Sequence, residues 1–166
     1  ATSTTYDASG RRLTETDPNG NTTSFTHDVA GRLTETVHAD GMRSRIEYDA
    51  LDRKAAEIDP AGRRTEYAYD ALGRLTNVML AAGTASATVT TYAYDEAGNR
   101  TDQTDAEGRN THWTFDAAGR ERTRTLPLGQ SEQTSYDAAG DRLSHTDFRG
   151  RTTTYVNGGF GLLTGI

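Results

Sequence analysis

The fold of this chain can be worked out from one stretch, Tyr67-Ala68-Tyr69-Asp70-Ala71-Leu72-Gly73-Arg74-Leu75. Its centre has the chemistry of a tight turn, because an Asp side chain at the first turn position accepts hydrogen bonds from backbone N–H groups two residues further on. Gly73, at the fourth position, can adopt the left-handed conformation that closes a β-hairpin with a bulge. The stretch therefore predicts two antiparallel strands joined by a turn. The same pair of turn residues recurs at Asp7 and Gly10, Asp28 and Gly31, Asp95 and Gly98, Asp116 and Gly119, and Asp137 and Gly140.

The leading Asp of this turn returns at a fixed period. The positions are Asp7, Asp28, Asp49, Asp70, Asp95, Asp116 and Asp137. Successive positions are 21 residues apart, except for a gap of 25 between Asp70 and Asp95. Such a period is typical of one supersecondary unit stacked on copies of itself. The sequence thus predicts a single array over residues 1–166, with a loop insertion near 80–87. The last repeat, from about residue 155, is expected to be degenerate or truncated, with Gly158 in place of the Asp and Gly161 keeping the register.

A second set of turns falls ten residues after the first, at 17–20, 59–62, 105–108 and 147–150. Each period therefore holds two strands of about six or seven residues, and turns this short join antiparallel neighbours. The predicted fold class is all-β: an antiparallel β-hairpin array of about eight 21-residue repeats in a twisted or spiralling sheet. Leu75 and Met79 are expected to share one face of it. Gly83→Val is expected to cost less stability than Gly73→Val, because Gly83 lies in the expanded loop.

Aromatic residues precede the turns at a spacing of two, which puts their side chains on one face of a strand. The pairs lie one and three residues before the Asp: Tyr67 and Tyr69, Tyr92 and Tyr94, Trp113 and Phe115. Registered repeats should align them as two ladders across the sheet. The ladders are interpreted first as a shared core face. Stacked rings could also bind sugars, so these six residues are the candidate contacts for a glycan or a protein partner.

Composition excludes several classes of function. Leu, Ile, Val and Phe make up only 23 of 166 residues, so a closely packed globular core is not expected. The net charge of −6, with both signs interleaved, offers no basic patch for nucleic acid. Cysteine is absent, which removes disulfides and thiolate chemistry. The chain also lacks an apolar run of the ~18 residues that a membrane span needs, and residues 1–5 do not resemble a signal peptide.

The recurring Tyr-x-Tyr-Asp-x-x-Gly-Arg-Leu pattern, clear at 67–75 and approximate at 25–33 and 92–100, resembles the YD repeat of the rearrangement-hot-spot (RHS) proteins. The resemblance implies a long antiparallel sheet that spirals into a hollow shell. In bacteria such shells typically enclose the toxic C-terminal domain of secreted polymorphic toxins, and similar repeats occur in the teneurin adhesion proteins of animals. The self-cleaving Asp-Pro core segment of the bacterial shells has no match after Gly150, so the resemblance assigns no protease residues to this chain.

No motif indicates catalysis, a cofactor or a metal. The acidic turn at 17–21 matches neither an EF-hand nor the nonapeptide calcium repeat, so Asp is interpreted there as a turn former. The four histidines are scattered, without metal-ligand spacing: His27, His38, His112 and His145.

The leading hypothesis is a non-enzymatic segment of an RHS-type shell, whose partners are neighbouring repeats of the parent chain and an enclosed cargo or toxin domain. Secretion or display at the cell surface follows from the resemblance. One alternative is an extracellular adhesion module that binds glycans or proteins through the aromatic ladders. Another is a self-assembling array, because the edges of an open sheet invite pairing with a second copy.

Overall fold

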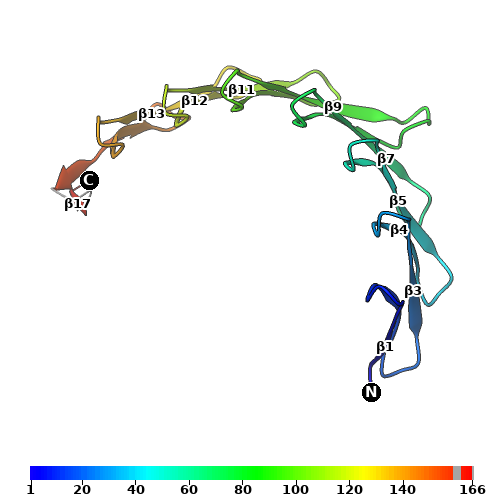
Figure 1. The fold of residues 1–166 in the computed structure, drawn as a ribbon. Coiled ribbons are helices and arrows are strands. Elements are labelled where there is room, and N and C mark those ends of the chain that lie inside the picture. Colours follow the sequence, from blue (N-terminus) through cyan, green and yellow to red (C-terminus); the bar gives the residue numbers. More distant parts are fainter. Residues whose placement is uncertain (159–161, 166) are drawn as a thin grey trace. The chain divides into compact units, whose positions relative to one another are not determined.

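The structure is a computed structural model that describes residues 1–158 and 162–165 (Figure 1). The described residues form strands and turns without a helix, which confirms the all-β class. None of them forms a helix that could cross a membrane. The first strands are β1 (Ser3–Tyr6), β2 (Arg12–Thr16), β3 (Thr22–His27), β4 (Leu33–Val37), β5 (Arg43–Tyr48), β6 (Lys54–Ile58), β7 (Arg64–Tyr69) and β8 (Leu75–Leu80). The later strands are β9 (Thr88–Tyr94), β10 (Arg100–Thr104), β11 (Asn110–Phe115), β12 (Glu121–Thr125), β13 (Ser131–Tyr136), β14 (Arg142–Thr146), β15 (Thr152–Thr154), β16 (Val156–Gly158) and β17 (Leu162–Gly165).

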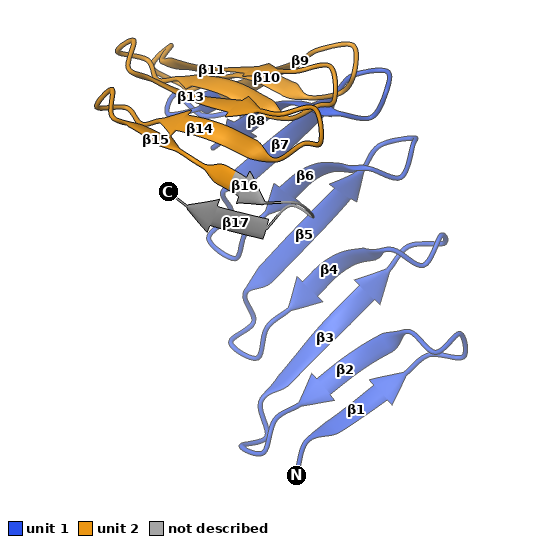
Figure 2. Ribbon diagram, turned by 90° about the vertical axis from the view of Figure 1, so that its left-hand side faces the viewer, with its two compact units in different colours: residues 1–89 blue, residues 90–166 orange. Residues whose placement is uncertain are grey.

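The chain divides into two compact units, residues 1–89 and 90–166 (Figure 2). In the first unit, strands β1 to β8 pair in the order of the sequence, and all the pairs are antiparallel. Strands β9 to β15 pair in the same way in the second unit. Strands β16 and β17 form a separate antiparallel pair at the predicted degenerate repeat, and Gly161 lies outside the described residues. The expectation of a single array stays a prediction.

The first turns are hydrogen-bonded through both backbone and side chain. At 70–73, the Gly73 amide donates to the Asp70 carbonyl over 3.0 Å, and Gly73 has a φ of +82°. The Asp70 carboxylate accepts the backbone N–H groups of Leu72 and Arg74, both at 2.9 Å. The turn at 49–52 has the same bond with Asp52 in place of Gly, at a φ of +63°, a conformation that Asp tolerates better than most residues.

A bulge accompanies each first turn and changes which face the following strand presents. The register shifts between Ala68 and Tyr69, so Leu75 pairs with Tyr69 while Met79 pairs with Glu66. Directly paired residues share a face, and Tyr69 and Glu66 are three residues apart on one strand. Leu75 and Met79 therefore lie on opposite faces, and the prediction that they share one was wrong, because it ignored the extra residue of the bulge.

The sheet has a half-buried aromatic face and an exposed polar face. Along β11, Thr111, Trp113 and Phe115 are the more buried residues, and the residues between them are exposed. Among the described residues, only three apolar side chains are classed as buried, and they are Ala56, Ala82 and Trp113. Stability must therefore come largely from contacts between half-buried groups.

The loop insertion is anchored to the strand beside it. The backbone N–H of Ala82 donates to the Arg64 carbonyl over 3.0 Å, and the Thr84 hydroxyl donates to the Ala81 carbonyl over 2.7 Å. Gly83 has a φ of +81°, nearly that of Gly73. The loop therefore also needs a left-handed residue, which the sequence interpretation had assigned only to the tight turn.

Candidate functional site

An arginine follows five of the seven first turns, and at three of them it stacks on a tyrosine of the next repeat. Arg53 donates its Nε to the Asp49 carboxylate over 2.8 Å, within its own turn. Its Nη1 donates to the carbonyl of Asp70, in the next turn, over 3.2 Å. The guanidinium carbon lies 4.6 Å from the centroid of the Tyr69 ring. The Tyr69 hydroxyl in turn donates to the Lys54 carbonyl over 2.9 Å. We call this set of contacts the Arg–Tyr clamp.

The clamp recurs in both units. In the first unit, Arg32 stacks 4.5 Å from the Tyr48 ring, and the Tyr48 hydroxyl donates to the Leu33 carbonyl over 3.0 Å. In the second unit, Arg120 lies 4.6 Å from the Tyr136 ring, whose hydroxyl donates to a backbone carbonyl at 3.1 Å. In every case the Tyr follows its Arg by 16 residues, at the same place in the neighbouring repeat. The contact therefore depends on the register of the array.

The same bonds hold the turn carboxylates in their ionised form. The backbone N–H of Arg53, followed by its guanidinium, lowers the pKa of Asp49. The backbone N–H of Arg74, followed by its guanidinium, lowers the pKa of Asp70 in the same way. Asp and Arg thus form a fixed pair in these two turns.

Cations also cover the aromatic rings that lie three residues before the Asp of a first turn. Arg100 lies 4.7 Å from the Trp113 ring and 5.7 Å from the Tyr92 ring. Lys54 lies 5.8 Å from the Tyr67 ring. A guanidinium or ammonium group over an aromatic face is attracted by the ring quadrupole. These rings therefore already have a partner within the sheet.

Ion pairs cover the polar face. Arg64 contacts the carboxylates of Glu47 and Glu66, each at 2.7 Å, and these two, in that order, raise its pKa. Their neighbour Ala56 pairs with both Glu residues across the strands and is fully buried. The sequence analysis missed this cluster, because Arg64 and Glu47 are 17 residues apart and come together only once the register of the strands is known.

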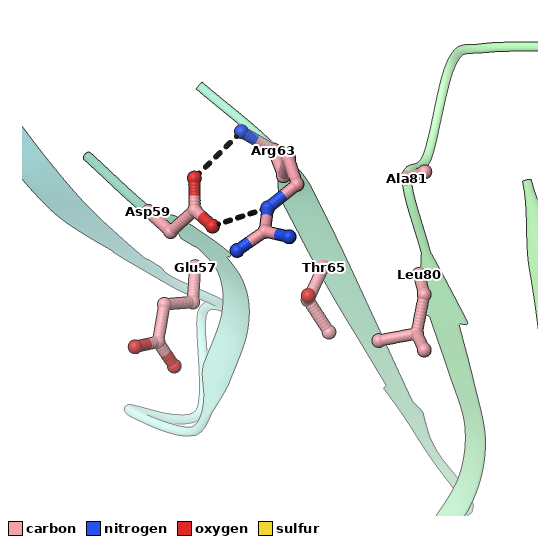
Figure 3. Close-up of a pocket in the computed structure, with 6 residues that line it drawn as sticks. All are labelled: Glu57, Asp59, Arg63, Thr65, Leu80 and Ala81. Atoms are coloured by element: carbon pink, nitrogen blue, oxygen red, sulfur yellow. Dashed lines mark hydrogen bonds and ion pairs between the residues drawn. The ribbon is translucent and has the colours of Figure 1, made fainter. Parts of the chain in front are cut away.

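An open groove lies at the edge formed by the second turns of the first unit, with a volume of about 480 Å³ (Figure 3). The Asp59 carboxylate accepts the backbone N–H and the Nε of Arg63, as the dashed lines show. The remaining lining residues are Glu57, Thr65, Leu80 and Ala81. A groove of 460 Å³ occupies the equivalent place in the second unit, between Asp105, Arg109, Leu126 and Pro127. The groove is therefore a feature of the repeat.

A family model described as RHS repeat matches five stretches of the chain, residues 6–44, 48–85, 77–109, 94–131 and 115–152. The chain belongs to the RHS repeat family.

Solved structures share the fold of these RHS repeats at low sequence identity. The crystal structure of TcdB2-TccC3 without its hypervariable C-terminal region matches with a TM-score of 0.77 and 20% identity, over 98% of this chain and 10% of that chain. TcdB2-TccC3-Cdc42 matches with a TM-score of 0.75 and 19% identity, over 95% and 10%. The Photorhabdus luminescens Tc holotoxin pore matches with a TM-score of 0.74 and 20% identity, over 94% and 10%. The RHS chain thus spans about a tenth of the length of these proteins. No curated protein sequence matches it.

The described RHS residues contain no group of three or more His, Asp or Glu side chains that could hold a metal ion. Two of the histidines bond to polar side chains of the neighbouring strand. His112 bonds to the Asp102 carboxylate at 2.9 Å, and His145 bonds to the Thr134 hydroxyl at 3.1 Å.

The six candidate contact residues are less exposed than the residues between them on β7, β9 and β11, so the two members of each pair lie on one face of their strand. Their alignment as ladders across the sheet stays a prediction. Tyr69 lies in a clamp, and Trp113 is buried under Arg100. Tyr94 and Phe115 occupy the position next to the turn. Glycan or partner binding by this set stays a prediction.

Proposed function

We propose that this chain is a non-catalytic segment of an RHS-type shell wall, which encloses the cargo domain of a secreted toxin. The observation that carries the proposal is the Arg–Tyr clamp. It adds a side-chain connection between repeats to the backbone pairing of the strands, which would hold neighbouring repeats of a wall in register.

The physical mechanism is steric. Strands of five or six residues at ~3.3 Å each form a ribbon roughly 16–20 Å wide. Within each unit the backbone groups of neighbouring strands are bonded to one another, so the ribbon offers a protease little extended backbone to bind. Support comes also from the fold shared with the TcdB2-TccC3 structures and the Photorhabdus luminescens Tc holotoxin pore. Secretion and an enclosed toxin domain belong to the proposal on the same grounds.

The test uses the natural full-length product. Its mass, and the masses of any cleaved fragments, would first establish whether a separate domain accompanies the repeats. The product is then digested with a nonspecific protease, beside the same domain produced without the repeats. We expect the domain to survive within the product and to be degraded alone. Degradation at equal rates, or the absence of any such domain, would refute enclosure.

A further inference from the structure

Two repeats of the first unit neutralise the cation that stacks on the ring of the next repeat. Arg12, which lies over the Phe25 ring, donates to the Glu15 carboxylate over 2.7 Å. Lys54 donates to the Glu57 carboxylate over 2.8 Å. In both repeats the acid follows the cation by three residues along the same strand. A carboxylate at this position therefore compensates the charge of the stacked cation.

Arg100 has the same place in the second unit, but the residue three positions further on is the neutral Gln103. Arg100 is exposed, and its guanidinium carbon lies between the Trp113 and Tyr92 rings, 4.7 and 5.7 Å from their centroids. Within the described part of the chain, Arg100 makes no ion pair and no hydrogen bond. Two rings thus hold a guanidinium whose N–H donors have no acceptor in the sheet.

A second guanidinium without a hydrogen bond lies beside the same tryptophan. Arg124 pairs directly with Trp113 across the strands, and its guanidinium carbon lies 5.9 Å from the ring. Its Nη1 is 3.7 Å from the Glu132 carboxylate, which is too far for a hydrogen bond. Its Nε is buried and has no partner among the described residues. Since buried polar groups normally have one, this Nε favours a ligand that supplies an acceptor.

Gln103 adds an uncharged amide on the same face. It pairs directly with Tyr92 on one side and with Thr111 on the other, and directly paired residues share a face. Thr111 is two residues from Trp113, so Gln103 lies on the face of the two arginines. Glu132 is the one carboxylate within ion-pair distance of either arginine in the residues that the structure describes. The group therefore has a surplus of positive charge and of hydrogen-bond donors.

We propose that Arg100, Gln103 and Arg124 form a binding site for the carboxylates of an acidic polypeptide segment. A planar guanidinium fits a carboxylate through two parallel N–H···O bonds, and stacking on a ring fixes its orientation before the ligand arrives. Trp113 is only 9% exposed, so its ring has no free face on which a sugar could stack. An extended peptide presents side chains on one side every ~7 Å, a spacing that the flexible arginines of β10 and β12 can meet. This binding would hold whether or not the wall encloses a domain.

The test measures binding of a dye-labelled hexaglutamate peptide to the full chain by fluorescence anisotropy, beside a hexaglutamine peptide. The emission of Trp113, the only tryptophan of the chain, is followed in a titration with unlabelled peptide and reports whether the peptide reaches this site. We expect saturable binding of hexaglutamate that weakens as salt is added and changes the Trp113 emission. Absence of binding, an unchanged emission, or equal binding of the two peptides would overturn the proposal.

Two variants that add the same charge on opposite faces locate the site. Gln103→Glu gives Arg100 the acid that Arg12 and Lys54 have, and should lower the affinity several-fold. Gln133→Glu is the matched control, because Gln133 is exposed and is adjacent in sequence to Glu132, which shares the face of Arg124. This control should leave the affinity nearly unchanged, and circular dichroism verifies that both variants fold. Equal weakening by the two variants would place the binding elsewhere and refute the site.

An acidic sugar offers the same carboxylate and is the competing ligand. Oligogalacturonate is therefore titrated in parallel, and we expect it to bind more weakly than hexaglutamate. Tighter binding of the sugar, weakened in the same way by Gln103→Glu, would assign the site to acidic glycans and overturn the peptide. None of these results bears on enclosure, which is measured by the protease resistance of the separate domain.

Discussion

Replacement of Arg53 by Ala, compared with the same change at Arg63, measures what the clamp contributes. Both arginines pair through Nε with the Asp of their own turn. Only Arg53 also lies 4.6 Å from a tyrosine ring and donates to a carbonyl of the next repeat. The stacking contributes ~0.5–1 kcal/mol and the hydrogen bond ~0.5–1.5 kcal/mol. We therefore expect Arg53→Ala to lower the free energy of unfolding by about 1–2 kcal/mol more than Arg63→Ala, or about 3–6 °C in Tm.

The assay is urea and thermal unfolding followed by circular dichroism. Arg53→Lys is the informative third variant, because it keeps the charge but cannot make the Nε pair, the stacking and the Nη1 bond together. It should recover less than half of the loss. A double-mutant cycle with Tyr69→Leu isolates the coupling between the two residues, because this change removes the ring on which Arg53 stacks. Equal losses at Arg53 and Arg63 would refute the clamp as a source of stability.

Further predictions concern single groups. Tyr69→Phe should lower the free energy of unfolding in urea by ~0.5–1.5 kcal/mol, because the hydrogen bond from the hydroxyl to the Lys54 carbonyl is lost. An unchanged free energy would mean that water replaces this bond. Since the pKa of Asp70 is lowered in the folded state, its contribution to stability is present above its ordinary value of 3.8 and is lost as the pH falls through the lower folded value. The urea concentration at the unfolding midpoint should therefore stay constant near neutral pH and decrease when the pH is lowered below about 4. In Asp70→Asn the decrease should be smaller. Trp113→Ala should lower Tm, at a cost of ~3 kcal/mol in the free energy of unfolding, because it removes a ring that is only 9% exposed. A glycan screen of this variant beside the native chain tests the sugar-binding prediction directly. Loss of a saturable glycan signal in a folded Trp113→Ala chain would favour adhesion over enclosure.

The features that sequence predicted best are those encoded by residues close together in the chain. The turn at 70–73 needs only Asp70 and Gly73, so its hairpin and its period could be read directly. The clamp could not be predicted in this way, because Arg53 and Tyr69 are 16 residues apart. Their contact can be inferred only when the register of the strands is known. The faces of Leu75 and Met79 were mispredicted for a related reason, since one bulged residue changes the alternation of the whole strand.

The length of the loop around Gly83 did not predict the backbone conformation of this residue. The expanded loop was expected to relax the need for a left-handed residue, yet Gly83 has a φ of +81° and Ala81 one of +53°. The anchoring bond from Ala82 to the Arg64 carbonyl turns the chain sharply at this point, and a sharp turn needs a positive φ somewhere. The sequence shows where the extra residues are, but this bond joins residues that are far apart in the chain and is not visible in the local pattern. Any difference between Gly83→Val and Gly73→Val must therefore come from how freely each turn can rearrange.

The arginine-rich composition follows from the way this sheet is held together. The chain has 17 Arg and a single Lys, and very few buried apolar side chains among its described residues. A guanidinium can pair with a carboxylate, stack on a ring and donate to a carbonyl at once, and Arg53 makes all three contacts. An ammonium group can satisfy these demands only one at a time. Because each clamp spans two repeats, the contacts grow in proportion to the length of the array, as the area of a thin sheet does. A buried core would have required a second layer to cover one face of this sheet.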